Sequence, residues 1–181
     1  MISSAPPSRS FCLIRHGATT ANARGIIAGV AEVSLTALGR DQARALSDKS
    51  WPEQIAVHAS PQERARITAE LAFPGREIKV HPGLRERDWG IFEGRPLSEQ
   101  PPREETPLQG ESWSEMLVRV RTTIMDICAG SEDALPVLVC HSGVIRAARV
   151  LWTTGDVGQR PPNATPLWFQ RTGNTVSETL I

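Results

Sequence analysis

Residues 11–17 read Phe-Cys-Leu-Ile-Arg-His-Gly, and the predicted fold follows from this stretch. Four apolar residues run without a break and end at two polar side chains, Arg15 and His16. A short apolar run of this kind is typical of a strand buried on both faces, as in a parallel sheet covered by helices. Residues 55–59 and 136–140 form two further runs of the same character. The chain is therefore expected to contain a central parallel sheet.

Helices are expected between these strands, because several segments begin with capping signals. Ser60-Pro61-Gln62-Glu63 and Ser112-Trp113-Ser114-Glu115 both have the spacing of a capping box, with a proline at the first helical position in the first case. Two more helices are expected, one from Ala37 to about Lys49 after Thr36 and one from Ser142 or Gly143 onward. Further strands are expected at residues 77–81, 166–170 and 175–180. The predicted fold class is α/β, a three-layer α/β/α sandwich with a mostly parallel central sheet.

The 181 residues suit one domain, which we place at residues 11–181. Residues 1–10 contain two prolines and no apolar core of a signal peptide, so they predict a disordered N-terminal tail. Residues 90–110 are rich in proline and glycine. We expect a short cap segment, about residues 87–110, to lie over one edge of the sheet.

Composition argues against several classes of partner. Twenty basic residues balance twenty acidic ones, so no overall field favours nucleic acid or an anionic membrane. The apolar runs are too short to cross a bilayer. Three cysteines without CxxC spacing indicate reduced core thiols in a cytoplasmic protein, and no spacing gathers metal ligands. We expect neither a metal nor another cofactor, and a homodimer is possible.

Polar clusters follow three of the predicted strands. Parallel strands end at the same edge of a sheet, where ligands of such folds bind. Helix N-termini and arginine forks both favour phosphate there. The residues concerned are Arg15, His16 and Asn22 after the first strand, Ser60 and Arg64 after the second, and His141, Ser142, Gly143 and Arg146 after the third.

These residue types suit transfer of a phosphoryl group. A histidine attacks only as neutral imidazole, and the nearby cations Arg15 and Arg64 disfavour its protonated form. The same cations stabilise charge on the transferring group. Glu86 lies in a glycine-flanked stretch, residues 83–94, and is the candidate proton donor to the leaving oxygen. Arg87, Trp89, Arg95 and Arg103 are plausible residues of the pocket lining.

The set resembles the histidine phosphatase superfamily, also called the phosphoglycerate mutase-like family. The opening motif R-H-G-x-T-x-x-N is similar to residues 15–22, and the stretches S-x-x-x-R-A and H-x-G-x-x-R are similar to residues 60–65 and 141–146. The acid motif L-x-E-x-x-x-G-x-x-E-G is similar to residues 84–94, and a G-E-S triplet follows at residues 110–112. Two positions depart from the family pattern: Ala18 replaces Glu or Gln, and Glu32 replaces Asp.

The resemblance implies that His16 carries the phosphoryl group, that Glu86 donates the proton, and that Arg15, Arg64 and His141 surround the phosphoryl group. Asn22, Ser142 and Gly143 are further expected substrate contacts. The short segment between Gly94 and Gly110 resembles the phosphatase branch, so we expect release of phosphate from a small phosphorylated metabolite. Two alternatives stay open: a phosphoglycerate mutase-type phosphotransferase, and a catalytically inactive protein that binds phosphorylated ligands.

Overall fold

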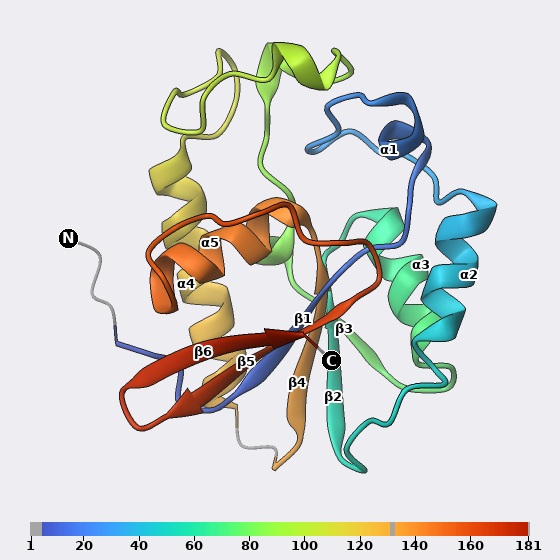
Figure 1. Cartoon of the computed structure of the whole chain (residues 1–181), viewed down its shortest axis with the longest axis vertical. Coiled ribbons are helices and arrows are strands. Elements are labelled where there is room, and N and C mark those ends of the chain that lie inside the picture. Colours follow the sequence, from blue (N-terminus) through green and yellow to red (C-terminus); the bar gives the residue numbers. More distant parts are fainter. Residues whose placement is uncertain (1–4, 131–132, 181) are drawn as a thin grey trace.

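The computed structural model describes residues 5–130 and 133–180. Its centre is a six-stranded sheet in the order β3-β2-β4-β1-β5-β6 (Figure 1). Strands β1, β2, β3 and β4 run parallel to one another, β5 pairs antiparallel with β1, and β6 pairs antiparallel with β5. The bounds are Phe11–Arg15 for β1, Ile55–Ala59 for β2, Ile78–Val80 for β3, Leu135–Cys140 for β4, Pro166–Thr172 for β5 and Thr175–Leu180 for β6. The sequence prediction of a mostly parallel sheet is confirmed.

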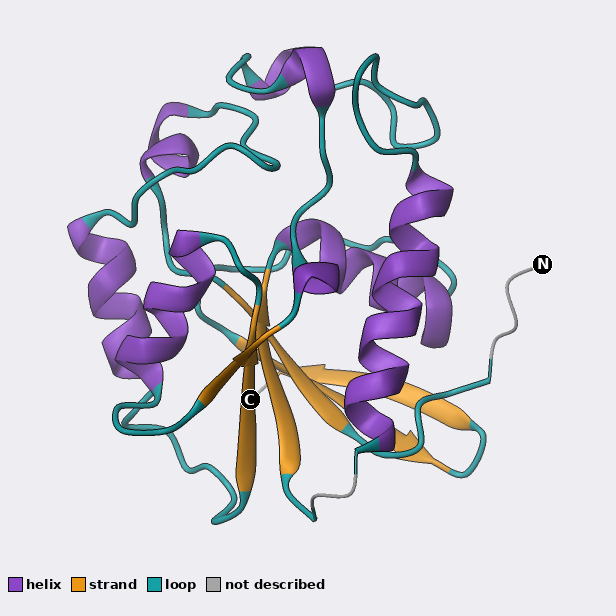
Figure 2. Ribbon diagram, turned by 180° about the vertical axis from the view of Figure 1, so that it is seen from behind, coloured by secondary structure: helices purple, strands orange, loops and turns teal. Residues whose placement is uncertain are grey.

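Helices cover both faces of the sheet, which gives three layers (Figure 2). Side chains of β1 alternate between the two faces: Phe11 and Leu13 pack in the core under α4 and α5, whereas Cys12 and Ile14 pack in the core under α2 and α3. All five residues of β1 are buried, as the unbroken apolar run predicts. The helices are α1 Thr20–Arg24, α2 Ala37–Ala45, α3 Glu63–Ala72, α4 Trp113–Ala129 and α5 Ser142–Trp152.

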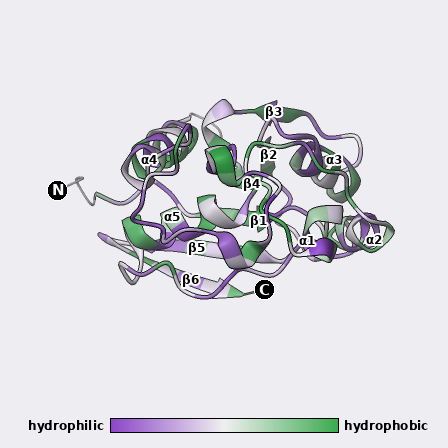
Figure 3. Cartoon of the chain, turned by 90° about the horizontal axis from the view of Figure 1, so that it is seen from above, coloured by the Kyte–Doolittle hydropathy of each residue, from purple (hydrophilic) through white to green (hydrophobic). Residues whose placement is uncertain are grey.

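A cap lies above the end of the sheet to which β1, β2 and β4 run (Figures 1 and 2). It combines the loop after α1 with residues 87–110, which contain the short 3₁₀ helices Gly90–Phe92 and Leu97–Glu99. Seen from above, the cap elements and the helices surround the strand ends (Figure 3). Ile27 N donates to Arg95 O and Gly94 N donates to Ile27 O, which joins the two parts of the cap.

Capping signals predicted one helix well and another poorly. Ser112 and Glu115 form the expected capping box at the start of α4. The helix α3 begins two residues later than expected, with Gln62 as its N-cap residue and no side-chain cap. The prediction of a capping box at Ser60 is wrong, because the first helical residue is Glu63, whose N–H donates to Oε2 of Glu32 and not to Ser60.

The N-terminal residues that the structure describes contact the domain. Ser8 donates its hydroxyl hydrogen to Cys128 O, and Arg171 reaches back to Ser8 O and to the Ser10 hydroxyl. The Trp152 indole donates to Ala5 O. Residues 5–10 therefore differ from the expected disordered tail: hydrogen bonds from α5 and β5 hold them. Residues 1–4 of the predicted tail lie outside the described residues.

Candidate active site

Strand pairing brings the two candidate histidines together. Strands β1 and β4 are parallel neighbours with Arg15 opposite Cys140, so His16 and His141 each follow the end of a strand at the same edge. His16 N donates to Cys140 O at 3.0 Å, and the centroids of the two imidazole rings are 5.3 Å apart. Ser60 follows β2 in the same way, with its N–H on Val139 O. The predicted convergence of three strand ends is present.

One hydrogen bond determines the tautomer of His16. Its Nδ1 lies 2.8 Å from Gly17 O. A carbonyl oxygen only accepts, so Nδ1 carries the hydrogen and Nε2 of the neutral ring keeps a free lone pair. Burial, and after it the charges of Arg64 and Arg15, lower the pKa of His16 well below 6.5. At neutral pH the ring is therefore a neutral imidazole with Nε2 as its nucleophilic atom.

His141 is also neutral and is held by Ser60. Burial and the charge of Arg64 lower the pKa of His141 well below 6.5. The Ser60 hydroxyl accepts from Gln62 N at 3.3 Å and can donate to Nε2 of His141. In that arrangement Nδ1 of His141 carries a hydrogen, yet this buried atom has no hydrogen-bond partner. An acceptor oxygen from a ligand would satisfy it.

Two buried arginines surround the histidines. Arg64 is 1% exposed and donates to the carbonyls of Ala28, Gly29 and Ala31 in the cap loop. Arg15 donates from Nη1 to Pro161 O, while its buried Nε has no partner. Burial, followed by the charge of Arg160, lowers the pKa of Arg15 to about 10, so it stays charged at neutral pH.

Unpaired buried donors are costly, at about 1–3 kcal/mol each, and native proteins contain few of them. Nε of Arg15 and Nδ1 of His141 are two such atoms among the described residues. Both belong to residues at the ends of neighbouring strands. An anion bound there would pair with both, which makes this edge of the sheet a candidate anion site.

Glu86 lies at the N-terminus of α5. Its Oε2 accepts from Gly143 N at 2.9 Å, and its Oε1 accepts from Arg87 N at 2.8 Å. Position 143 has to be glycine for this contact, because a Cβ there would lie 2.0 Å from Oε1 of Glu86. Gln62 accepts a hydrogen bond from Glu86 N at 2.8 Å and so fixes the backbone as well. Each carboxylate oxygen retains a second lone-pair direction that can carry a proton.

A cavity of about 150 Å³ opens between the cap and α5 beside Glu86. Its lining includes the expected residues Ser142, Gly143, Trp89 and Arg103, together with Ile27, Ala28, Leu97, Gln100, Arg146 and Arg160. The predicted lining residues Arg87 and Arg95 are not part of it. Arg95 lies on the surface, paired with Glu99.

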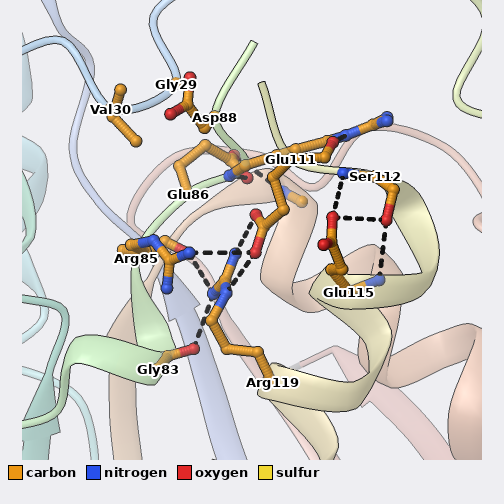
Figure 4. A network of polar contacts seen from close by, with 12 residues as sticks. Gly29, Val30, Gly83, Arg85, Glu86, Asp88, Glu111, Ser112, Glu115 and Arg119 are labelled. Atoms are coloured by element: carbon orange, nitrogen blue, oxygen red, sulfur yellow. Dashed lines mark hydrogen bonds and ion pairs between the residues drawn. The ribbon is translucent and has the colours of Figure 1, made fainter. Parts of the chain in front are cut away.

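Arg87 instead holds the cap together. It is completely buried and donates to the carbonyls of Glu111, Arg103 and Glu105. The neighbouring carboxylate of Glu111 accepts from Nε and Nη2 of Arg119 and from Nη2 of Arg85 (Figure 4). Nothing in the sequence pattern indicates these long-range contacts, which join the cap to α4.

Asn22 belongs to a hydrogen-bond chain that reaches His16. Its Oδ1 accepts from Thr19 N in the capping box of α1 and from Nδ2 of Asn163, which also donates to His16 O. Asn22 is not among the residues that line the cavity. Asn163 has no recognisable sequence signal. It lies 147 residues from His16 along the chain.

The described residues contain neither a metal-binding cluster of side chains nor a membrane-spanning helix. No group of three or more His, Cys, Asp and Glu side chains in residues 5–130 and 133–180 is arranged to hold a metal ion. In the same part of the chain, every helix is too short or too polar to cross a bilayer. The three cysteines are buried free thiols, as predicted.

The chain is similar to known proteins over most of its length. Residues 11–166 match the sequence model of the histidine phosphatase superfamily (branch 1). A metal-independent phosphoserine phosphatase of Arabidopsis thaliana is 32% identical over 155 residues, which cover 75% of this chain and 65% of that protein. A probable phosphoglycerate mutase of Enterobacter sp. (strain 638) is 33% identical over 147 residues, or 71% of this chain and 67% of the mutase.

The fold of the chain is also similar to that of a solved structure. The crystal structure of phosphoglycerate mutase from Thermus thermophilus superposes with a TM-score of 0.76 at 31% identity and covers 95% of this chain and 98% of that one. The relatives thus include proteins named as phosphatases and as mutases. With the family match over most of its length, the chain belongs to branch 1 of the histidine phosphatase superfamily.

Proposed function

We propose that the chain is a phosphomonoesterase that transfers the phosphoryl group of a small phosphorylated metabolite to Nε2 of His16 and then to water. The observation that carries this proposal is the hydrogen bond between Nδ1 of His16 and Gly17 O. It leaves Nε2 as the unprotonated atom of a neutral ring. Burial among cations keeps the ring neutral at physiological pH, as a nucleophile requires.

In the first step the phosphoryl group lies against the unpaired donors of Arg15 and His141. Arg64 adds charge from the side of the cap loop, so developing charge on the phosphoryl oxygens is stabilised. Nε2 of His16 forms a bond to phosphorus while the bond from phosphorus to the ester oxygen breaks. Protonated Glu86 gives its proton to that oxygen, and the alcohol leaves.

In the second step water attacks the phosphohistidine. Glu86, now a carboxylate, takes a proton from the water as the phosphorus–nitrogen bond breaks, and inorganic phosphate is released. His16 returns to its neutral form with the lone pair again on Nε2. Glu86 thereby regains its proton in every turnover, and no step consumes another reactant.

One feature favours hydrolysis over retention of the phosphoryl group, and another indicates the size of the substrate. The cap between Gly94 and Gly110 is short, so water has access to His16 once the alcohol has left. The cavity of about 150 Å³ suits a metabolite of a few carbons, since pockets for drug-sized ligands are about 300–1,000 Å³.

Release of phosphate from a metabolite panel, with p-nitrophenyl phosphate as a generic substrate, tests the proposal. We expect turnover by the wild-type chain and by Arg66→Gln, whose side chain is exposed on α3, and no turnover by His16→Ala. Interconversion of 3-phosphoglycerate and 2-phosphoglycerate without net phosphate release would indicate the mutase alternative. Binding of phosphate without turnover of any ester would indicate the inactive binder.

A further inference from the structure

The cavity is lined by three arginines other than Arg15 and Arg64, which lie next to His16 and do not line it. Arg103 comes from the cap, Arg146 from α5, and Arg160 from the segment between α5 and β5. Three independent parts of the chain thus supply an arginine to one small space. Glu86 is the only acidic residue of the described cavity lining, so the lining has an excess of positive charge.

Two of these arginines have buried donors without a partner. Nη1 of Arg103 and Nε of Arg146 are both buried, and neither makes a hydrogen bond. Other contacts hold the two side chains in place: the Arg103 guanidinium stacks 4.7 Å from the centroid of the Trp113 ring, and Nη2 of Arg146 donates to Gly158 O. The two unpaired donors are therefore fixed parts of the structure and not ends of freely moving chains.

The neighbouring charges of the cavity repel one another. Burial, and then the charges of Arg103 and Arg160, lower the pKa of Arg146. Glu86 offsets part of this charge, and an anionic ligand would compensate the rest. The phosphoryl site already has its own cations, Arg15 and Arg64, and its own unpaired donors. The outer arginines, Arg103, Arg146 and Arg160, are therefore available to a different anion.

We propose that Arg103, Arg146 and Arg160 form a subsite for a second anionic group, a carboxylate or a second phosphate, on the alcohol part of the phosphomonoester. The inference rests on the proposed function, because it assumes that the phosphoryl group itself occupies the site beside His16. It narrows the substrate class to small phosphomonoesters with two anionic groups. Trp89 and Leu97 then enclose the short carbon chain between the two groups.

Three esters of equal chain length test the subsite. They are the monophosphate of 1,3-propanediol, which has a neutral end, 3-phosphonooxypropanoate, which has a carboxylate, and 1,3-propanediol bisphosphate. Hydrogen bonds to a charged group predict that kcat/KM for at least one ester with a second anionic group exceeds that for the neutral-ended ester by about 10- to 100-fold. The larger of the two values identifies the preferred anion.

Variants connect this preference to the arginines. Arg103→Gln and Arg160→Gln should each reduce the ratio of kcat/KM between the preferred ester with a second anionic group and the neutral-ended ester by about tenfold. Arg103→Lys should restore part of the ratio because it keeps the charge. The matched control is Arg66→Gln, which removes an exposed arginine of α3 that does not line the cavity and should keep the ratio of the wild type.

The inference and the proposed function can fail separately. Equal loss for all three esters would mean that the outer arginines serve the phosphoryl group itself, and equal kcat/KM in the wild type would mean that no second anion is recognised. Either result overturns the inference while phosphatase activity stands. If no ester is hydrolysed, calorimetry with 3-phosphonopropanoate and propylphosphonate still tests the subsite. We expect 3-phosphonopropanoate, which has the carboxylate, to bind more tightly, and Arg103→Gln to abolish the difference. Equal affinities of the two compounds for the wild type would overturn the inference.

Discussion

Replacement of Gly143 by alanine should disable the proton donor without disturbing the nucleophile. An added Cβ would lie 2.0 Å from Oε1 of Glu86, whereas ordinary contacts begin at about 3.4 Å. The carboxylate therefore has to move by more than 1 Å and loses the hydrogen bond from Gly143 N. A misplacement of about 1 Å at a reacting group can reduce the rate about 10²-fold.

The loss should depend on the leaving group. An alkoxide leaves poorly without a proton, so we expect about a 10²-fold slower phosphorylation of the chain by an alkyl phosphate. The loss should be much smaller for p-nitrophenyl phosphate, because nitrophenolate leaves without help. Glu86→Gln should show the same dependence, since it keeps the shape of the side chain and removes the transferable proton. Single-turnover kinetics isolate this step from hydrolysis of the phosphohistidine.

Folding and specificity of the effect are checked with a second glycine. Gly130→Ala places its Cβ 3.2 Å from Ile127 O, at the end of α4 and outside the cavity lining, and should leave both rates near those of the wild type. Alanine is the better helix former by about 1 kcal/mol, so Gly143→Ala should not unfold α5 through propensity. A folded Gly143→Ala chain with equal losses for both leaving groups, or with no loss, would refute the assignment of Glu86 as the acid.

Three further predictions concern the histidines and the independence of the reaction from added metal. Below pH 6.5, His16 and His141 bind protons in the unfolded chain but not in the folded one, because burial lowers their pKa values. The free energy of unfolding should therefore fall with falling pH, by up to about 1.4 kcal/mol per pH unit for each histidine. Urea unfolding between pH 5 and 7 measures this slope, and an equal slope in the double variant His16→Asn, His141→Asn would contradict the prediction. Ser60→Ala removes the partner of His141 Nε2 and should reduce kcat about tenfold or more. The buried acceptor left without a partner should also lower the free energy of unfolding by about 1–3 kcal/mol. Wild-type kcat in the folded variant would show that this contact does not orient the ring. EDTA should leave the rate of phosphate release unchanged, and loss of activity that Mg²⁺ or Zn²⁺ restores would mean that the mechanism is wrong.

Local sequence signals predicted the parts of the fold that local physics controls. The unbroken apolar run of β1 is a strand buried on both faces, and the capping box at Ser112 begins α4. Ser60 has the same capping signal, but α3 begins at Glu63, whose N–H donates to Glu32. The Ser60 hydroxyl accepts from Gln62 N and lies against His141 Nε2, and sequence spacing does not reveal a contact that depends on strand pairing.

Of the candidate site, only the residues that directly follow the parallel strands could be placed from the sequence. Neighbouring parallel strands placed His16 and His141 at one edge, as expected. The tautomer of His16 depends on the direction of one carbonyl, Gly17 O, which no side-chain pattern encodes. The role of buried Arg87 in the cap and the contact of Asn163 with His16 O join residues far apart in the chain, so only the folded structure reveals them.

The most direct test of the account is the identity of the atom that carries the phosphoryl group. The chain is mixed for milliseconds with substrate labelled in its phosphate, quenched in alkali, and digested for mass spectrometry under conditions that preserve phosphohistidine. We expect acid-labile, base-stable label on Nε2 of His16, formed and lost at rates that account for turnover, and no label in His16→Ala. Label on another residue, or turnover by His16→Ala within tenfold of the wild type, would contradict the account.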